Sequence, residues 1–143
     1  MIQWPKLPDY GIYSVWPQEG IEAFHPDDRD KVDGWVPSDH VFERTKFDGE
    51  YYHVRIGSII ELRIKPVLWL PVHFEGLRVG DQVEVLGNNL QNDAVIATII
   101  TMKYSSVRQV IEYSLEHQDM QIEKPFTASE LVRLPGTLDR NGS

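Results

Sequence analysis

Apolar side chains occupy every second position in two neighbouring stretches, residues 52–56 and 60–64, which are separated by Gly57-Ser58. Alternation with a period of two is typical of half-buried β-strands, and a Gly-Ser pair favours a turn. A two-residue loop would mix apolar and polar side chains on both faces of this hairpin, so we predict an odd-length loop or a bulge at Ile59. The predicted pairs are Ile56 with Ile60, Val54 with Leu62 and Tyr52 with Ile64.

A second hairpin is predicted from residues 94–104 and 107–116, which alternate around Ser105-Ser106. A loop of even length places a mostly apolar set on one face. That set is Ile96, Thr98, Ile100, Met102 and Tyr104 with Ile111, Tyr113 and Leu115. The opposite face is too apolar to lie in water, since it carries Val95, Ala97, Ile99 and Val110. We therefore expect the N-terminal half of the chain to cover that face.

Residues 1–39 are rich in proline and aromatic side chains, which excludes long helices and central strands there. We predict a short strand over residues 11–16 and a short helix over residues 26–33. Pro26 suits the first helical position, the two acidic residues after it suit the positive end of the helix dipole, and Gly34 suits its end.

The chain has 143 residues and a net charge of −8, and 41% of its residues are hydrophobic. This is the composition of a soluble globular protein, and its negative field repels nucleic acid and anionic membranes. The sequence contains no cysteine, which excludes disulfides, cysteine nucleophiles and cysteine-based zinc sites. Its apolar runs are far shorter than the roughly 20 residues of a membrane span, and it begins without the pattern of a secretory signal. We expect a cytoplasmic protein.

Residues 76–134 resemble small SH3-like barrels of the Tudor and KOW type. The matching segments are residues 80–85, 95–99 and 110–115 as the first three strands, 124–131 as the closing loop and turn, and 132–134 as the last strand. The resemblance implies a fold and no function, because many unrelated functions use this barrel. An aromatic cage is not expected, since the first loop contains no aromatic residue.

The whole chain also resembles an uncharacterised bacterial family of small proteins, through the segments "YGIYSVWPQEG", "HPDD" and "GEYYHVRIG". That resemblance implies no function either.

These patterns together predict a mostly β protein, with an SH3-like small barrel in the C-terminal half packed on a proline-rich and aromatic-rich N-terminal region. That region holds one β-hairpin and one short helix. We expect residues 1–143 to form a single cooperative unit, because no Gly/Ser-rich linker interrupts the chain. Its subregions are residues 1–74, the barrel over 75–134 and a flexible tail over 135–143.

Two groups of residues have the composition of a metal or catalytic site. His25, Asp27, Asp28 and Asp30 are all metal-ligand types, but acidic residues in a first helical turn are expected from the helix dipole alone. Ser38-Asp39-His40 has the residue types of a hydrolase triad, yet adjacent side chains diverge along the chain and cannot align. We therefore predict no catalytic residues, no metal site and no cofactor, and keep a small metal-dependent enzyme as an alternative.

One face of the first predicted hairpin gathers a set of basic and aromatic side chains, which we call the basic stripe. It consists of Tyr51, His53, Arg55, Arg63 and Lys65. The stripe has two interpretations. It is either an internal contact with the acidic remainder of the chain, of which the helix carrying Asp27, Asp28 and Asp30 is one candidate, or a docking patch for an acidic protein or another anionic ligand, with the Tyr51 ring available for stacking.

The function predicted from these observations is that of a non-catalytic binding or assembly module whose partner is another protein. A nucleic-acid-associated small barrel is the alternative, which the charge balance disfavours because residues 75–134 hold nine acidic and five basic side chains. No membrane partner is expected. The sequence leaves the oligomeric state open.

Overall fold

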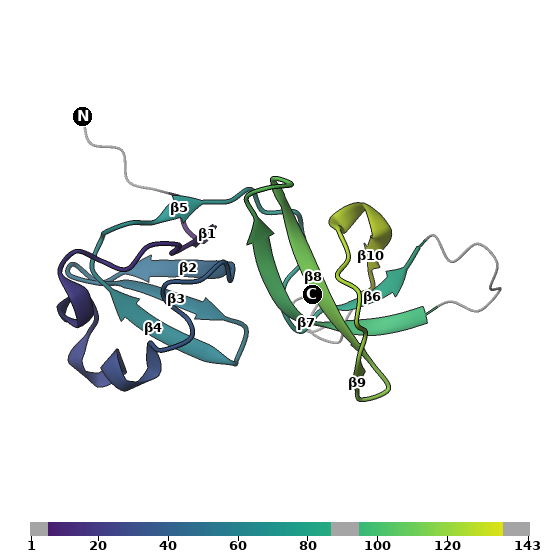
Figure 1. The fold of residues 1–143 in the computed structure, drawn as a ribbon, viewed down its shortest axis with the longest axis horizontal. Helices are drawn as coiled ribbons and strands as arrows, with labels where there is room; N and C mark the ends of the chain where they lie inside the picture. The colour runs from purple at the N-terminus through teal and green to yellow at the C-terminus, as the bar shows by residue number, and fades with distance from the viewer. Residues whose placement is uncertain (1–5, 87–94, 136–143) are drawn as a thin grey trace. The chain divides into compact units, whose positions relative to one another are not determined.

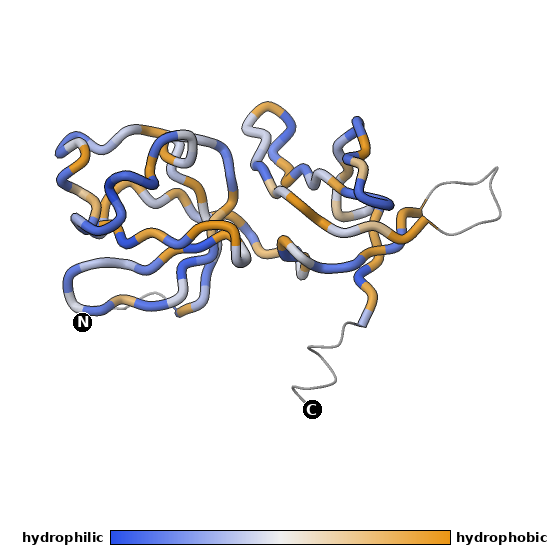
Figure 2. Tube along the Cα trace, turned by 90° about the horizontal axis from the view of Figure 1, so that it is seen from below, coloured by the Kyte–Doolittle hydropathy of each residue, from blue (hydrophilic) through white to orange (hydrophobic). Residues whose placement is uncertain are grey.

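The computed structural model describes residues 6–86 and 95–135 of the chain. The chain divides into two compact units, residues 1–74 and 75–143, and each contains a five-stranded antiparallel sheet (Figure 1). Hydrophobic segments run along the strands of both units (Figure 2). The prediction of a mostly β protein is confirmed, whereas the single cooperative unit stays a prediction.

The sheet of the first unit has the strand order β4-β3-β2-β1-β5. The strands are β1 (Asp9–Ile12), β2 (Phe42–Phe47), β3 (Tyr52–Ile56), β4 (Ile60–Ile64) and β5 (Leu70–Pro71). All neighbouring strands are antiparallel. β4 and β5 are therefore the two outer strands of this sheet.

The β3–β4 hairpin has the predicted register. Ile56 lies opposite Ile60, Val54 opposite Leu62 and Tyr52 opposite Ile64. The loop has three residues, and the Ile59 N–H donates to the Ile56 carbonyl oxygen at 2.9 Å. Gly57 adopts a φ of 52°, a left-handed conformation that glycine accepts without steric cost. The apolar pairs share one face because the odd loop length places them in the same register, and all of their side chains are buried except that of Ile60, which is half-buried.

The first strand begins and ends earlier than predicted, at Asp9 and Ile12 instead of residues 11–16. Its position depends on a close backbone approach at Gly11. A Cβ atom there would lie 2.5 Å from both the Leu70 carbonyl oxygen and the Trp69 ring. Only glycine fits this contact, so the sequence pattern that placed Gly11 at the start of a strand missed its role in the middle of one.

Two 3-10 helices lie between β1 and β2, namely η1 (Gly20–Ala23) and η2 (Pro26–Lys31). η2 occupies the place of the predicted helix but ends before residue 33. Its 3-10 form accounts for the shorter length, because this geometry is poor in long runs. The His25 ring caps its first turn, since Nδ1 accepts a hydrogen bond from the Asp27 N–H at 3.1 Å.

A buried ion pair joins β1 to β2. Arg44 is only 7% exposed, and its guanidinium donates to the two Asp9 carboxylate oxygens at 2.8 and 2.7 Å. The guanidinium carbon lies 4.2 Å from the ring centre of Tyr52 and 4.6 Å from that of Trp69. The charge is thus paired in its plane and covered by aromatic rings, which offsets the cost of burying it.

The sheet of the second unit has the order β10-β6-β7-β8-β9. The strands are β6 (Gln82–Val85), β7 (Val95–Ser105), β8 (Val110–His117), β9 (Met120–Gln121) and β10 (Leu131–Arg133). β7 and β8 include the second and third strands of the SH3-like resemblance, β6 covers residues 82–85 of its first strand, and β10 covers residues 132–133 of its last. The 3-10 helix η3 (Ala128–Glu130) precedes β10. Within the described residues the sheet is open, because β9 and β10 are its outer strands.

The β7–β8 hairpin differs from the predicted one in its loop and in its faces. Ser105 pairs with Val110, so the loop has four residues and not two. A bulge lies between Ile99 and Thr101, and it shifts the register so that Ile99 pairs with Leu115. Ile99 therefore shares the core face with Leu115, and the predicted apolar set holds only beyond the bulge. Ile96 lies on the outer face and is 39% exposed, and the expected cover by the N-terminal half of the chain stays a prediction.

Two predicted features lie outside the described residues: the loop at residues 87–93, and all but one residue of the tail at 135–143.

Candidate binding face of the β3–β4 hairpin

The pairing of β3 with β4 brings the strand members of the basic stripe together. His53 lies opposite Arg63, and Arg55 lies opposite Glu61. Lys65 follows β4 directly. Because successive residues of a strand point to opposite faces, these side chains lie on the face away from the buried apolar pairs. The sequence placed the stripe on one face of this hairpin, and the register of the two strands does the same.

Arg63 is bound by Asp28 of η2. The Arg63 Nε and terminal nitrogen donate to the Asp28 carboxylate at 3.0 and 3.2 Å, and the Arg63 backbone N–H donates to it at 2.8 Å. Lys31 Nζ lies 3.1 Å from the same carboxylate. Burial by itself raises the pKa of Asp28, but the hydrogen bonds from Arg63 and Lys31 outweigh it and hold that pKa below its usual value.

The other charged members of the stripe also have acidic partners within the first unit. The distances are 2.9 Å for His53 Nε2 to Asp48 Oδ2, 2.8 Å for Arg55 Nε to Glu43 Oε1, and 3.7 Å for Lys65 Nζ to Glu19 Oε2. Each charge on the stripe is therefore close to an opposite one. This arrangement supplies the internal contact that was one of the two interpretations, although it comes from four separate acids and not from the helix alone.

Tyr51 does not lie on the outer surface with the charged members. Its side chain is buried, and its ring centre lies 5.3 Å from that of His25. Its backbone N–H donates to Asp48 at 2.8 Å, and the Glu50 N–H donates to the same oxygen at 2.9 Å. These two bonds hold the pKa of Asp48 well below its usual range. Tyr51 is thus part of a closed turn, and its ring is not free for stacking.

η2 lies against β4 through the contact of Asp28 with Arg63, and a hollow opens near each end of this contact. The first hollow, of about 650 Å³, is lined by residues 25–27, 48–51 and Arg63. His25 and Asp27, two of the residues with the composition of a metal site, are among those that line it. Within the described part of the chain, no group of three or more His, Asp or Glu side chains is placed to hold a metal ion.

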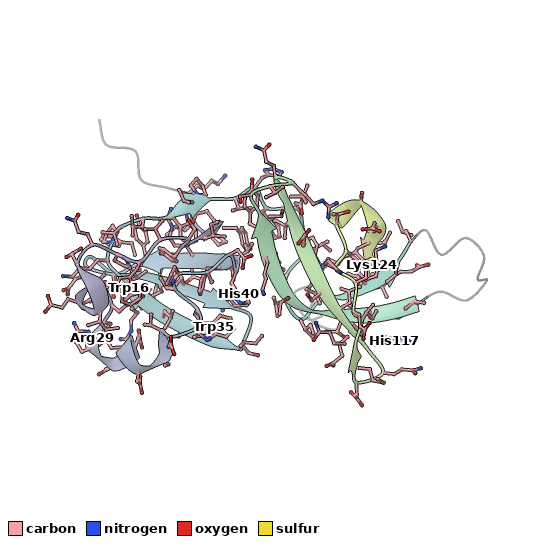
Figure 3. All side chains as sticks on the ribbon, viewed as in Figure 1. Trp16, Arg29, Trp35, His40, His117 and Lys124 are labelled. Carbon is pink, nitrogen blue, oxygen red and sulfur yellow. The ribbon has the colours of Figure 1, made fainter. Side chains whose placement is uncertain are left out.

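The second hollow, of about 640 Å³, is lined by Lys31, Trp35, Arg55 and residues 57–61. Trp35, labelled in Figure 3, is half-buried, and its ring centre lies 4.7 Å from that of His40. Ile59, at the tip of the hairpin, is 53% exposed. This hollow thus combines apolar surface with two basic side chains, and we call it the Trp35 groove.

Sequence reasoning found Arg55 but missed the other main residues of the Trp35 groove. Large aromatic side chains are mostly buried, so the sequence gives no sign that Trp35 lines a groove. Lys31 was read only as part of a helix. Ile59 is the residue from which the groove could have been predicted. The odd loop length that gives the correct hairpin register also places this apolar residue at the tip of the hairpin.

The comparisons with known proteins show the family of the chain. A model for a family of unknown function, DUF6960, matches residues 1–132, and the chain belongs to this family. Neither a curated protein nor a solved structure is significantly similar to it. Among the described residues, no helix is both long and apolar enough to cross a membrane.

Proposed function

We propose that this member of the DUF6960 family is a non-catalytic binding module whose ligand is another protein, and that the Trp35 groove is its binding site. The observation that supports this most is the combination of a half-buried Trp35 with an exposed Ile59 beside the outer strand of a sheet. Aromatic side chains that are neither buried nor fully exposed are frequent anchors of protein interfaces. Exposed isoleucine at a hairpin tip adds apolar area that a partner can cover.

The charge balance of the stripe favours a protein ligand over a nucleic acid. A phosphate backbone is bound by cations that are free to replace its counterions. Here Arg63, Lys65 and His53 already lie beside carboxylates, and Tyr51 is buried. These three side chains therefore offer little to a phosphate backbone, and the net charge of −8 repels one.

We also propose that the second unit is an open relative of the SH3-like small barrels. Its strand order supports this, because β6, β7 and β8 form a meander and β10 returns to pair with β6. The short helix η3 precedes that last strand, and Thr127 and Glu130 close it with reciprocal hydrogen bonds. We place the protein in the cytoplasm of a bacterium, a proposal that cell fractionation tests.

The binding proposal is tested by purifying the tagged full chain from its native cells. We expect a protein to co-purify in near-stoichiometric amount with the wild type and to be lost with Ile59→Glu. Val107→Glu is the matched control, since Val107 is also an apolar residue of a hairpin loop and is 93% exposed. Equal recovery with Ile59→Glu and Val107→Glu contradicts the proposed site, and recovery of nuclease-sensitive material in place of a protein contradicts the proposed function.

A further inference from the structure

The backbone of β4 is open at the Trp35 groove. β4 is an outer strand, yet its C-terminal half is covered: the Arg63 carbonyl oxygen accepts from the His25 N–H at 3.0 Å, and the Lys65 N–H donates to the Ala23 carbonyl oxygen at 2.8 Å. These bonds show that the backbone groups of residues 63 and 65 point away from β3. Since the direction alternates along a strand, the N–H and C=O of Glu61 point away from β3 as well.

Residues 23–28 cover Arg63, whereas no comparable segment of the described chain covers Glu61. Among the described residues, no hydrogen bond is found from the outward side of Glu61 to η2 or to the segment after it. Its side chain is exposed, and the residue lines the Trp35 groove. An outer strand with an unpaired donor and acceptor is a template for the addition of another strand.

Three charged side chains line this groove, and two of them, Lys31 and Arg55, are positive beside the exposed Glu61. The Lys31 and Arg55 side chains are 46% and 48% exposed, whereas their partners Asp28 and Glu43 are 4% and 13% exposed. The carboxylates of Asp28 and Glu43 are therefore mostly buried, while the cationic groups of Lys31 and Arg55 remain accessible. Arg55 donates to Glu43 through its Nε, and among the described residues no hydrogen bond is found from its terminal nitrogens, which can donate to a second carboxylate.

We propose that the Trp35 groove binds an extended acidic segment of the partner protein, which adds as a short strand to β4 at Glu61. This rests on the proposed function and names the chemistry of the partner. The segment exchanges backbone hydrogen bonds with Glu61, places carboxylates near Lys31 and Arg55, and packs an apolar side chain against Ile59 and Trp35. The strand pairing involves the backbone of only one residue of β4, so the side-chain contacts supply the specificity.

A second copy of this chain is a poorer occupant of the groove. Two β4 strands that pair around a two-fold axis at Glu61 place Glu61 of one copy opposite Glu61 of the other. Like charges directly opposite each other destabilise a strand pair. The same pairing also needs the outward groups of Arg63, which Asp28 and His25 already occupy.

The probes are two capped pentapeptides, Glu-Val-Glu-Val-Glu and Lys-Val-Lys-Val-Lys, titrated into the ¹⁵N-labelled full chain. We expect the acidic peptide to shift the amide signals of Glu61 and Ile59 and to bind at least tenfold more tightly than the basic one. Binding should weaken severalfold in high salt. Equal binding of the two peptides, or shifts confined to other residues, overturns the inference.

Two variants at one position separate backbone pairing from side-chain charge. Glu61→Pro removes the outward N–H, a substitution that an outer strand tolerates on its solvent side, while Glu61→Ala keeps it. We expect Glu61→Ala to bind the acidic peptide as well as the wild type or better, and Glu61→Pro to lose at least tenfold. Melting temperatures of both variants confirm that each is folded. Equal affinity of the two folded variants overturns the strand addition.

The two proposals fail in different ways. If the acidic peptide does not bind but the co-purified protein still depends on Ile59, the function stands and the acidic-strand inference is wrong. If the chain dimerises in analytical ultracentrifugation and Glu61→Pro abolishes the dimer, the occupant is a second copy and the inference is again wrong. If the peptide binds but Ile59→Glu has no effect on the co-purified protein, the proposed site of the function is wrong.

Discussion

The guanidinium of Arg63 and the carboxylate of Asp28 form a two-point contact that joins the outer strand of the first sheet to η2, with the Arg63 backbone N–H as a third donor to the same carboxylate. The Asp28 side chain is 4% exposed, while that of the adjacent Asp27 is 78% exposed. Asp27 and Asp28, which are adjacent in the sequence, therefore have different environments. The contribution of each to stability can be measured separately.

Asp28→Asn should destabilise the first unit by about 2 kcal/mol, because it removes the charge that Arg63 and Lys31 share and replaces one acceptor oxygen by a donor. Asp27→Asn is the control, and it should change the free energy of unfolding by less than about 0.5 kcal/mol, since that side chain is 78% exposed and lies no closer than 3.9 Å to Arg63 and His25, a contact that water screens. Urea unfolding at pH 7 measures both. A cost for Asp27→Asn equal to that of Asp28→Asn would show that helix-dipole effects, and not the Arg63 contact, account for the acidic pair.

The same contact makes stability depend on pH in the acid range. The pKa of Asp28 is lower in the folded chain than its usual value of 3.8. As pH falls below about 4, the unfolded chain takes up a proton at this site before the folded chain does. The stabilisation by Asp28 is therefore fully present above that pH and is lost as pH falls through the lower, folded-state pKa. Between pH 6 and pH 3, the free energy of unfolding should fall more steeply with pH for the wild type than for Asp28→Asn. The same dependence on pH in both proteins would contradict this.

The residues that share a face of the β3–β4 hairpin could be predicted from the sequence because one register alone puts all its apolar residues together. The partners of the stripe could not be predicted in the same way. Asp48 reaches His53 from a neighbouring turn, and Glu43 reaches Arg55 from β2. Such contacts depend on which strands are neighbours, and alternation within one hairpin does not determine that.

The second hairpin shows the opposite case. With a two-residue loop, its sequence pattern would place one set of apolar side chains on a single face. The bulge beside Ile99 gives a different register, in which the buried face is equally apolar. Both faces of β7 carry Val, Ile or Ala, so the hydrophobic pattern does not distinguish between the two registers. Thr98 and Ile96 consequently lie outside the core, and Ile96 is 39% exposed.

Gly11→Ala tests the close approach of β1 to the segment before β5. The added Cβ would lie 2.5 Å from the Leu70 carbonyl oxygen and from the Trp69 ring, so backbone has to move, and we expect a cost of about 2 to 4 kcal/mol. Gly34→Ala is the comparison. It adds a Cβ into open space at a φ of +86°, so it should cost only about 1 kcal/mol of backbone strain. Equal costs in chemical unfolding would mean that the first unit adjusts freely around Gly11.

Tyr113→Phe tests a partly buried hydrogen bond of the second unit, between the buried Tyr113 and the exposed Glu75. The Tyr113 hydroxyl donates to a Glu75 carboxylate oxygen at 2.6 Å, and burial together with this contact raises the pKa of Tyr113 well above its usual value. Removing the hydroxyl leaves the carboxylate without this donor, and we expect a loss of about 1 to 2 kcal/mol. Alkaline titration by ultraviolet absorbance should also show one tyrosine fewer among those that ionise only on unfolding. An unchanged titration would show that Glu75 does not hold the hydroxyl in solution.

Ile99→Asp tests both the bulged register and the cooperativity of the chain. Ile99 is fully buried beside Leu115, so an aspartate there leaves a charge without a partner and should cost several kcal/mol. Ile96→Asp is the matched control on the same strand, and it should cost far less because Ile96 lies on the outer face. In the two-residue-loop register the order of these costs would reverse, since Ile96 would then belong to the core.

The same variant tests whether the chain unfolds as one unit. Calorimetry of the wild type is expected to give one transition, and Ile99→Asp should lower the midpoint temperature of that whole transition. Two separable transitions, with only one of them shifted by Ile99→Asp, would show that the chain is two units that unfold independently.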